Sequence, residues 1–424
     1  MRYMEMRDYV YVKDVITMQK IEMLQVCTQI EAKVQSELDL KEHMADDEIA
    51  SLIDQVIISE AKVKNISLSE KIYMKEHVFH ALRGYDCLED IMKEEDITEI
   101  MVNGYQRIFV ERGGRLYAWE YGFSSEEKYM DVIQQIVGSC NRIVNESSPI
   151  VDARLPDGSR VNVVLPPIAL DGAVMTIRRF PRETYSLEDL CRMGMISEHI
   201  KQVLGLFVRC KYNIMISGGT GSGKTTFLNA LANQIPCDER IITIEDSAEL
   251  QIRGIPNLVR MEVRNANVEG KNEIPMKELI KSALRMRPTR IIVGEVRGEE
   301  ALQMLQAMNT GHSGSLSTGH ANSARDILYR LETMVLMGMD MPLPAIRQQI
   351  ASAIDLIVHI GRMKDGSRKV LEIAELRGID RGEIRLEPLY VWEDHEWKGK
   401  RKLEQTEKIM EMGYWEDYQE ICNI

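Results

Sequence analysis

Eight consecutive residues decide the fold class of this chain: Gly218, Gly219, Thr220, Gly221, Ser222, Gly223, Lys224 and Thr225, which read GGTGSGKT. They match the GxxxxGK[ST] pattern of a phosphate-binding loop. Glycines let backbone N–H groups turn inward around phosphate oxygens, the lysine reaches the terminal phosphates, and the threonine hydroxyl can bind Mg²⁺. The pattern predicts a nucleoside triphosphate site with Mg²⁺, extending to Thr226.

The segments on either side of the loop fit this interpretation. Residues 213–217 (NIMIS) predict a strand before the loop, and residues 225–235 (TTFLNALANQI) predict a helix after it. The N-terminus of such a helix adds a positive dipole end to the phosphate site. Beyond residue 210, apolar runs of strand length alternate with helical patterns, which indicates a parallel α/β sheet.

Two carboxylates end later strands of the same region. The predicted strand 240–244 (RIITI) is followed by Glu245, and Glu295 lies at the end of another in RIIVGEVRGEE, residues 290–300. The carboxyl ends of strands form the ligand edge of an open α/β sheet, where a carboxylate can hold Mg²⁺ or polarise the attacking water. A loop alone fits a kinase, a GTPase or an ATPase, and the two acids favour hydrolysis over binding alone. For Glu249, Glu299 and Glu300 we expect solvated turns.

A histidine pair follows. His312 and His320 flank a short polar strand, GSLST, within residues 310–326. No third histidine or cysteine lies at ligand spacing, so zinc is not expected. The pair is either structural or senses the terminal phosphate.

Upstream of the loop, residues 67–180 have a different sequence pattern. A helical stretch to residue 95 precedes short predicted strands at 97–104, 107–112 and 160–167, which indicates a compact α+β domain. Arginines gather at its end, as phosphate clamps or as an ordinary solvated face: Arg142, Arg154, Arg160, Arg178 and Arg179.

The remaining segments carry weaker signals. Residues 1–66 predict amphipathic helices, with apolar residues at Ile16, Met23, Val26, Ile30 and Val34, either as a small bundle or as a docking module. Residues 181–210 predict a linker and a helix, with a capping start at Ser186 to Asp189. We expect the motor domain to span 211–424, its last forty residues forming a strand pair and a helix.

Composition narrows the class of partner. Lys and Arg number 53 against 66 Asp and Glu, a net charge of −13, which argues against nucleic acid as partner. The seven cysteines are scattered, which fits a reducing cytoplasm rather than a disulfide framework. The start of the sequence lacks the apolar run of a signal peptide, and no segment approaches the roughly 18 apolar residues of a membrane span. Any membrane association is therefore expected to act through partners.

The loop, the acidic strand ends and the histidine segment, in this order, resemble the type II/IV secretion ATPase superfamily, closest to its CpaF/TadA branch, which assembles Flp (tight-adherence) pili. The resemblance covers roughly residues 67–379 and implies an α/β fold: a RecA-like P-loop ATPase domain preceded by an α+β N-terminal domain and an N-terminal helical segment. It implies Glu245 as the water-activating acid, Glu295 near Mg²⁺, and His312 and His320 near the terminal phosphate. DARLPDGSRVN and TIRRF match motifs whose arginines, here Arg154, Arg160, Arg178 and Arg179, approach the phosphates.

The resemblance also implies an assembly. Members of the superfamily suggest that the chain forms a homo-oligomer, a ring of six subunits with ATP held between the two domains. They also suggest that the ring docks on an inner-membrane platform protein at the cytoplasmic face. The four-cysteine zinc element of the type II secretion and type IV pilus extension branches is absent. We expect a cytoplasmic ATPase that couples Mg-ATP hydrolysis to Flp-type pilus assembly or protein secretion. The alternatives are a DNA-stimulated conjugation ATPase and a nucleotide-gated scaffold with little hydrolysis.

Overall fold

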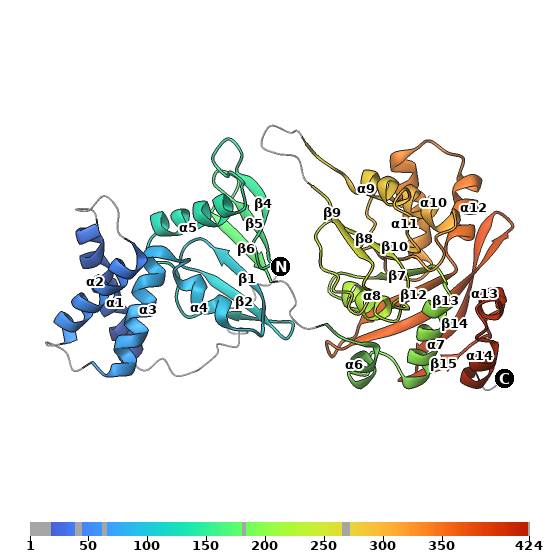
Figure 1. Cartoon of the computed structure of the whole chain (residues 1–424), viewed down its shortest axis with the longest axis horizontal. Helices are drawn as coiled ribbons and strands as arrows, with labels where there is room; N and C mark the ends of the chain where they lie inside the picture. The colour runs from blue at the N-terminus through green and yellow to red at the C-terminus, as the bar shows by residue number, and fades with distance from the viewer. Residues whose placement is uncertain (1–17, 39–44, 62–65, 180–183, 265–271, 423–424) are drawn as a thin grey trace, which may run out of the picture. The chain divides into compact units, whose positions relative to one another are not determined.

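The chain divides into two compact units, Met1–Phe180 and Pro181–Ile424 (Figure 1). The computed structural model describes residues 18–38, 45–61, 66–179, 184–264 and 272–422. Three features of the sequence lie outside these ranges: the start of the chain, Ile16, and the linker around Pro181.

Three helices begin the first unit: α1 (Met18–Leu38), α2 (Asp46–Ala61) and α3 (Leu68–Arg83). Their apolar faces meet in one cluster, in which Val26, Ile30 and Val34 of the predicted stripe are buried. Ser67 caps α3 in a reciprocal capping box with Glu70. The predicted helical stretch to residue 95 consists of two helices, α3, which ends before Gly84, and α4 (Cys87–Lys93).

An antiparallel sheet of six strands forms the rest of the first unit, in the order β3-β2-β1-β6-β5-β4. Its strands are β1 (Ile97–Asn103), β2 (Ile108–Arg112), β3 (Arg115–Ala118), β4 (Ile150–Arg154), β5 (Arg160–Val164) and β6 (Val174–Arg178). Residues of α4 and of α5 (Glu126–Ser139) pack with alternate strand residues in one core. The predicted strands at 97–104, 107–112 and 160–167 are present, whereas β3, β4 and β6 were not predicted.

A mixed sheet of nine strands forms the second unit, in the order β15-β14-β13-β12-β7-β11-β10-β8-β9. The run from β12 to β9 is parallel and the pairs from β12 to β15 are antiparallel. The strands are β7 (Ile214–Gly218), β8 (Ile241–Glu245), β9 (Leu258–Glu262), β10 (Arg290–Val293), β11 (Leu316–His320), β12 (Leu356–Arg362), β13 (Arg368–Asp380), β14 (Glu383–Glu393) and β15 (Glu396–Gly399).

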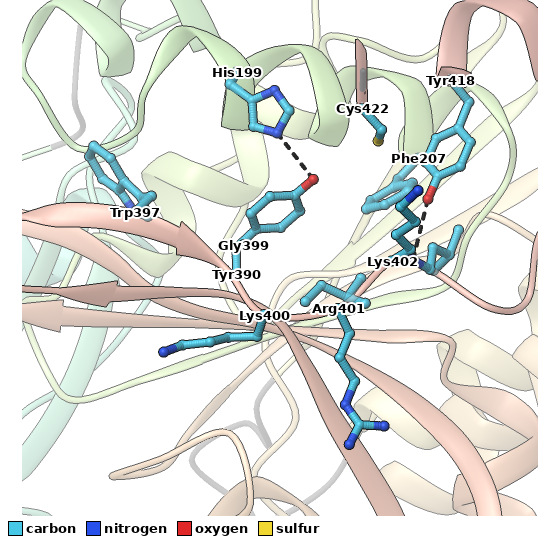
Figure 2. A pocket seen from close by; sticks show the side chains of 12 residues that line it. His199, Phe207, Tyr390, Trp397, Gly399, Lys400, Arg401, Lys402, Tyr418 and Cys422 are labelled. Atoms are coloured by element: carbon cyan, nitrogen blue, oxygen red, sulfur yellow. Dashed lines mark hydrogen bonds between the residues drawn. The ribbon is translucent and has the colours of Figure 1, made fainter. Parts of the chain in front are cut away.

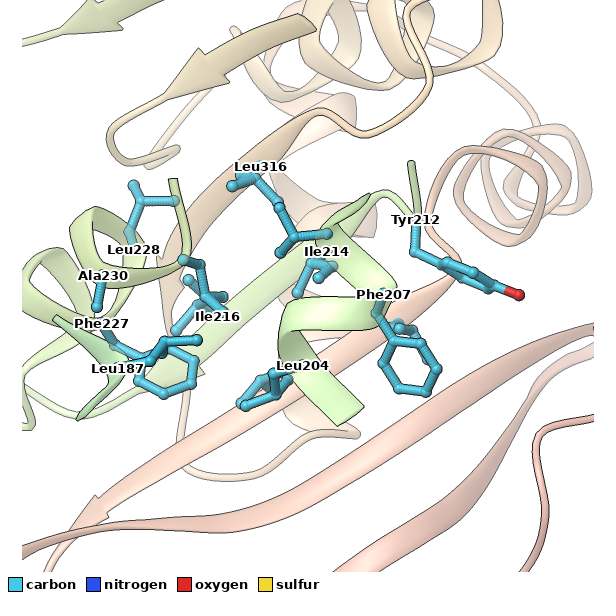
Figure 3. Packing of buried hydrophobic residues seen from close by; sticks show 14 of the residues in the cluster. Leu187, Leu204, Phe207, Tyr212, Ile214, Ile216, Phe227, Leu228, Ala230 and Leu316 are labelled. Carbon is cyan, nitrogen blue, oxygen red and sulfur yellow. The ribbon is translucent and has the colours of Figure 1, made fainter. Parts of the chain in front are cut away.

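Helices cover both faces of this sheet: α6 (Leu187–Arg192), α7 (Glu198–Arg209), α8 (Lys224–Ala232), α9 (Met276–Ala283), α10 (Ala301–Asn309), α11 (Asp326–Gly338) and α12 (Leu343–Ala353). Strand β7 shows why its sequence is continuously apolar. Ile214 and Ile216 pack with α7 and α8 (Figure 3), whereas Met215 packs on the opposite face with α10 and α11. A strand buried on both faces does not alternate between apolar and polar residues. The predicted α/β fold is confirmed.

Two segments contain more helices than the sequence predicted. The stretch 181–210 holds α6, which starts at the predicted capping box of Ser186 and Asp189, and also α7. The C-terminal segment holds the strand pair β14–β15 and two helices, α13 (Glu407–Glu411) and α14 (Trp415–Cys422). Lys408 of α13 ties this segment to the sheet through a 2.5 Å ion pair with Asp355.

No helix of the described ranges is both long enough and apolar enough to cross a bilayer.

Candidate nucleotide-binding site

The glycine-rich loop joins the buried strand β7 directly to helix α8, and its glycines are required by shape. Gly221 and Gly223 have φ of +70° and +92°, in the left-handed region that favours glycine. A Cβ on Gly218 would lie 2.4 Å from the carbonyl oxygen of Ile360 on the neighbouring strand β12. The loop thus turns within a tight space at the carboxyl edge of the sheet.

Lys224 opens α8 and is almost completely buried, with 7% of its surface exposed. Its Nζ donates to the carbonyl oxygen of Gly219 at 2.9 Å and to Nδ1 of His320 at 3.3 Å. Burial lowers the pKa of Lys224, and the nearby Glu295 opposes this effect. Thr225 and Thr226 follow in the first turn, where backbone N–H groups have no partner within the helix. Lys224 and the two threonines therefore lie together in the first turn at the N-terminus of α8.

Glu295 lies two residues beyond the end of β10 and extends the cluster. One carboxylate oxygen is 2.9 Å from Nε2 of His320, and the other accepts a hydrogen bond from Arg297 at 2.7 Å. Because Nδ1 of His320 accepts from Lys224, the hydrogen of the neutral imidazole is on Nε2. Burial lowers the pKa of His320, which favours this neutral form. Lys224 is thus hydrogen-bonded to His320, and His320 lies within ion-pair distance of Glu295 beside the loop, although this oxygen of Glu295 has no hydrogen-bond partner among the described residues.

Glu245 ends β8 and is 3% exposed. Its Oε2 accepts the backbone N–H groups of Glu249 at 2.8 Å and Leu250 at 2.9 Å, whereas Oε1 has no hydrogen-bond partner within the described ranges. Burial raises the pKa of Glu245 to about 7. Its Cγ lies 3.0 Å from the Cβ position of Gly294, so a side chain at 294 would make a tight contact with it. A carboxyl group that titrates near neutrality is suited to proton transfer.

The two histidines are separated by the full length of strand β11. His320 is level with Gly218 of β7, and Leu316 is level with Ile214. His312 precedes the strand at the opposite edge of the sheet, where its Nδ1 is 3.2 Å from the carbonyl oxygen of Ala307. The structure brings His320 to the loop of its own chain and does not bring His312 there.

The arginines of the first unit also fall into two groups with different surroundings. Arg154 and Arg160 are paired residues on β4 and β5, and Arg160 is paired with Arg178 on β6, so the three side chains form a row on one face of the sheet. The side chain of Arg178 is 59% exposed and lies 3.9 Å from Glu99. Arg179 is instead engaged with backbone, since its guanidinium donates to the carbonyl oxygen of Glu94.

Two residues near the loop were not singled out by the sequence. His359 of β12 is buried and its Nδ1 is 2.9 Å from the hydroxyl of Ser217, the residue before the loop. Arg368 of β13 donates through Nε to the carbonyl oxygen of Gly221 at 3.0 Å. Neither lies in a recognisable motif, because each reaches the loop only through the pairing of β12 with β7 and of β13 with β12.

A separate pocket of about 510 Å³ lies between α7, β14, β15 and α14 (Figure 2). His199 and Tyr390 meet there, with Nε2 of the imidazole 3.1 Å from the phenol oxygen. None of the predicted site residues lines this pocket.

A loop of this shape at the end of a buried parallel strand, with carboxylates at neighbouring strand ends, defines a P-loop nucleotide-binding protein of the α/β class. The chain belongs to the type II/IV secretion system protein family, whose model matches residues 82–385. This is a family of secretion ATPases, so the predicted superfamily is confirmed. The match leaves out α1, α2 and most of α3 and ends within β14.

The alignments with relatives of this chain cover most of each relative's length. A putative conjugal transfer protein of Mycobacterium tuberculosis is 35% identical over 318 residues, 73% of this chain and 89% of the relative. The type IV secretion system protein VirB11 of Bartonella henselae is 32% identical over 338 residues, 70% of this chain and 93% of the relative. The X-ray structure of the Yersinia pseudotuberculosis ATPase DotB has a TM-score of 0.51 at 15% identity, covering 81% of this chain and 84% of that one, a likeness of fold alone.

Proposed function

We propose that the chain is a Mg²⁺-dependent ATP hydrolase whose turnover drives assembly of a Flp-type pilus or a related protein secretion machine. The observation that carries the hydrolase assignment is the grouping of Lys224, His320 and Glu295 at the loop, with Glu245 at the end of the neighbouring strand β8, where burial raises its pKa to about 7. A nucleotide switch that only binds needs no second buried acid at this edge.

The residues fit the two cofactors. The turned glycine loop and Lys224 suit the phosphates of ATP, and the hydroxyl of Thr225 with a carboxylate oxygen of Glu295 are the oxygen donors that Mg²⁺ prefers. When bound, Mg²⁺ withdraws charge from the phosphate oxygens. Glu245, through the oxygen that lacks a hydrogen-bond partner, accepts the proton of the attacking water.

The remaining residues have supporting roles in this proposal. His320 connects the lysine that binds phosphate to the carboxylate that holds the metal, so it responds to the terminal phosphate. Arg154, Arg160 and Arg178 supply charge from the first unit, since guanidinium groups bind phosphate in pairs of hydrogen bonds. Arg179 is left out of the clamp because its guanidinium is engaged with Glu94.

An assembly is part of the same proposal. The proposal assigns one role to each segment: 1–66, whose helices pack with α3, as a helical bundle, 67–180 as the arginine domain, 181–210 as the linker and 211–424 as the motor. The chain acts as a homo-oligomer, a six-membered ring with ATP held between arginine domain and motor. It works in the cytoplasm on an inner-membrane platform protein. Support comes from the family match and from the placement of loop and arginine row on different units.

A DNA-stimulated conjugation motor is the second candidate. The relative from Mycobacterium tuberculosis carries the description of a conjugal transfer protein, which favours this reading. The net charge of −13 opposes it, because contacts to a polyanion need a surplus of Lys and Arg. A nucleotide-gated scaffold is disfavoured, because both Glu245 and Glu295 are retained.

The test is steady-state ATPase activity of the full chain with Mg²⁺, measured with and without DNA at two salt concentrations. Lys224→Ala should abolish nucleotide binding, and Glu295→Gln should keep binding while removing turnover. Glu278→Gln removes a half-exposed carboxylate on α9 and serves as the matched control. Equal rates in Glu295→Gln and the unmodified chain would refute the hydrolase assignment, whereas strong, salt-sensitive stimulation by DNA would favour the conjugation motor.

A further inference from the structure

The loop lies between two groups of strands with different chemistry. On one side β11, β10 and β8 bring His320, Glu295 and Glu245 to the carboxyl edge. On the other side the neighbours are β12 and then β13, which form an antiparallel pair. The reacting phosphate has to lie beside the acids, so the rest of a bound nucleotide extends toward the β12–β13 side.

The end of the β12–β13 pair rises past the loop. Ile360 is level with Gly218, and β12 continues for two more residues to Arg362, which is paired with Arg368. At about 3.3 Å per residue this carries the pair roughly 6–7 Å beyond the start of the loop. The turn that joins the two strands is well tied, because Met363 donates its N–H to Ser367 at 2.8 Å and Asp365 accepts the N–H of Ser367 at 2.9 Å.

Arg368 lies directly against the glycine loop. Its Nε donates to the carbonyl oxygen of Gly221 at 3.0 Å, and its Cδ is 3.2 Å from the Cβ position of Gly223. This hydrogen bond uses one of the five guanidinium donors and aims the side chain along the loop. The residue is exposed, so the other donors remain accessible to a ligand at the loop.

We infer that Arg368 binds the two phosphates that ATP and ADP share, from the side of the loop opposite to the acids. The inference rests on the proposed function, since it requires that the loop holds a nucleotide. Its basis is the position of the β12–β13 turn and the contact with Gly221. Arginine suits the role because its planar guanidinium keeps one N–H on the loop while others reach phosphate oxygens.

The experiment measures the dissociation constants of ATP and ADP by calorimetry, with Mg²⁺ and the full chain. The variants are Arg368→Ala, Arg368→Gln and Arg368→Lys, and the control is Lys364→Ala, which removes a charge from the same turn. Loss of one charge-assisted hydrogen bond typically weakens binding about tenfold or more. We expect this loss for both nucleotides in Arg368→Ala and Arg368→Gln, a smaller one in Arg368→Lys and none in the control.

Three results would overturn the inference. Affinity unchanged in Arg368→Gln would mean that the side chain only supports the carbonyl oxygen of Gly221. A loss confined to ATP would place the guanidinium on the terminal phosphate instead, and an equal loss in Lys364→Ala would reduce the effect to general charge. Lys224→Ala distinguishes a failure of this inference from a failure of the proposed function. If Lys224→Ala weakens nucleotide binding and Arg368→Ala does not, only this inference fails. If neither variant weakens binding, the proposed function fails.

Discussion

Replacing Glu245 by glutamine should stabilise the protein at pH 8 and change its stability little at pH 5. The carboxyl group is buried, and only Oε2 accepts hydrogen bonds, from the N–H groups of Glu249 and Leu250. Glutamine keeps an oxygen for these bonds and places a neutral NH₂ group where Oε1 lies. The substitution therefore removes a buried negative charge without removing a contact.

The magnitude follows from the pKa of Glu245, which is about 7 in the folded chain against an ordinary value of 4.5 for a glutamate side chain. Because the folded state holds the proton more tightly, stability conferred by the protonated form is lost as the pH rises from 4.5 through 7. The difference of 2.5 units corresponds to about 3.4 kcal/mol at about 1.36 kcal/mol per unit. The gain from glutamine should be about 3 kcal/mol at pH 8 and below about 1 kcal/mol at pH 5.

The assay is denaturant unfolding of both proteins at pH 5 and pH 8, together with thermal melting. For a unit of this size, about 3 kcal/mol corresponds to a rise in Tm on the order of 6–12 °C. Glu249→Gln, a partly exposed carboxyl on the same turn, should show no comparable gain. A Glu245→Gln protein that is no more stable than the unmodified chain at pH 8, or equally stabilised at both pH values, would refute the reasoning. Its turnover should be lost throughout, because glutamine accepts no proton.

Two further outcomes can be measured. Glu239→Ala should lower the free energy of unfolding, measured in urea, by about 3–5 kcal/mol. Arg290 is fully buried and donates hydrogen bonds of 2.6 and 2.8 Å to the two oxygens of Glu239, so the substitution leaves it without its counter-ion. A loss below about 1 kcal/mol would contradict this. His320→Ala should reduce ATP turnover at least about tenfold, which is the effect of losing one charge-assisted contact at the loop. His312→Ala should leave the turnover rate per site near that of the unmodified chain in a dilute assay. Equal losses in the two variants would show that both histidines act at the nucleotide.

The parts of the site that the sequence predicted are those coded within a few consecutive residues. The loop needs left-handed backbone at Gly221 and Gly223, and only the local residue type decides whether that is possible. Glu245 and Glu295 were found because they follow apolar runs, and the end of a parallel strand has a known place at the ligand edge. The sequence pattern predicted the end of this strand too late. Strand β10 ends at Val293, so Glu295 lies in the loop beyond it.

Direction along a strand was harder to predict than the strand itself. The segment around GSLST indicated a strand with a histidine on each side, and both were expected at the nucleotide. A parallel strand has only one end at the ligand edge, so its length separates His312 from His320. Arg178 and Arg179 differ for a similar reason, because successive residues point to opposite faces of a sheet and only Arg178 joins the row with Arg160.

Glu245 shows why the chemistry of a site is not contained in its motif. Burial raises its pKa to about 7, although the two backbone N–H groups that Oε2 accepts act in the opposite direction. Strand β10 pairs with β8, and Gly294, just beyond β10, lies against the Cγ of Glu245. Alanine at 294 would leave the acidic motif unchanged and yet require the Glu245 side chain to shift slightly, since a Cβ there would lie 3.0 Å from Cγ. The sequence places the acid at the edge of the sheet, whereas the burial that raises its pKa comes from the packing of residues far along the chain, among them Gly294 just beyond the neighbouring strand.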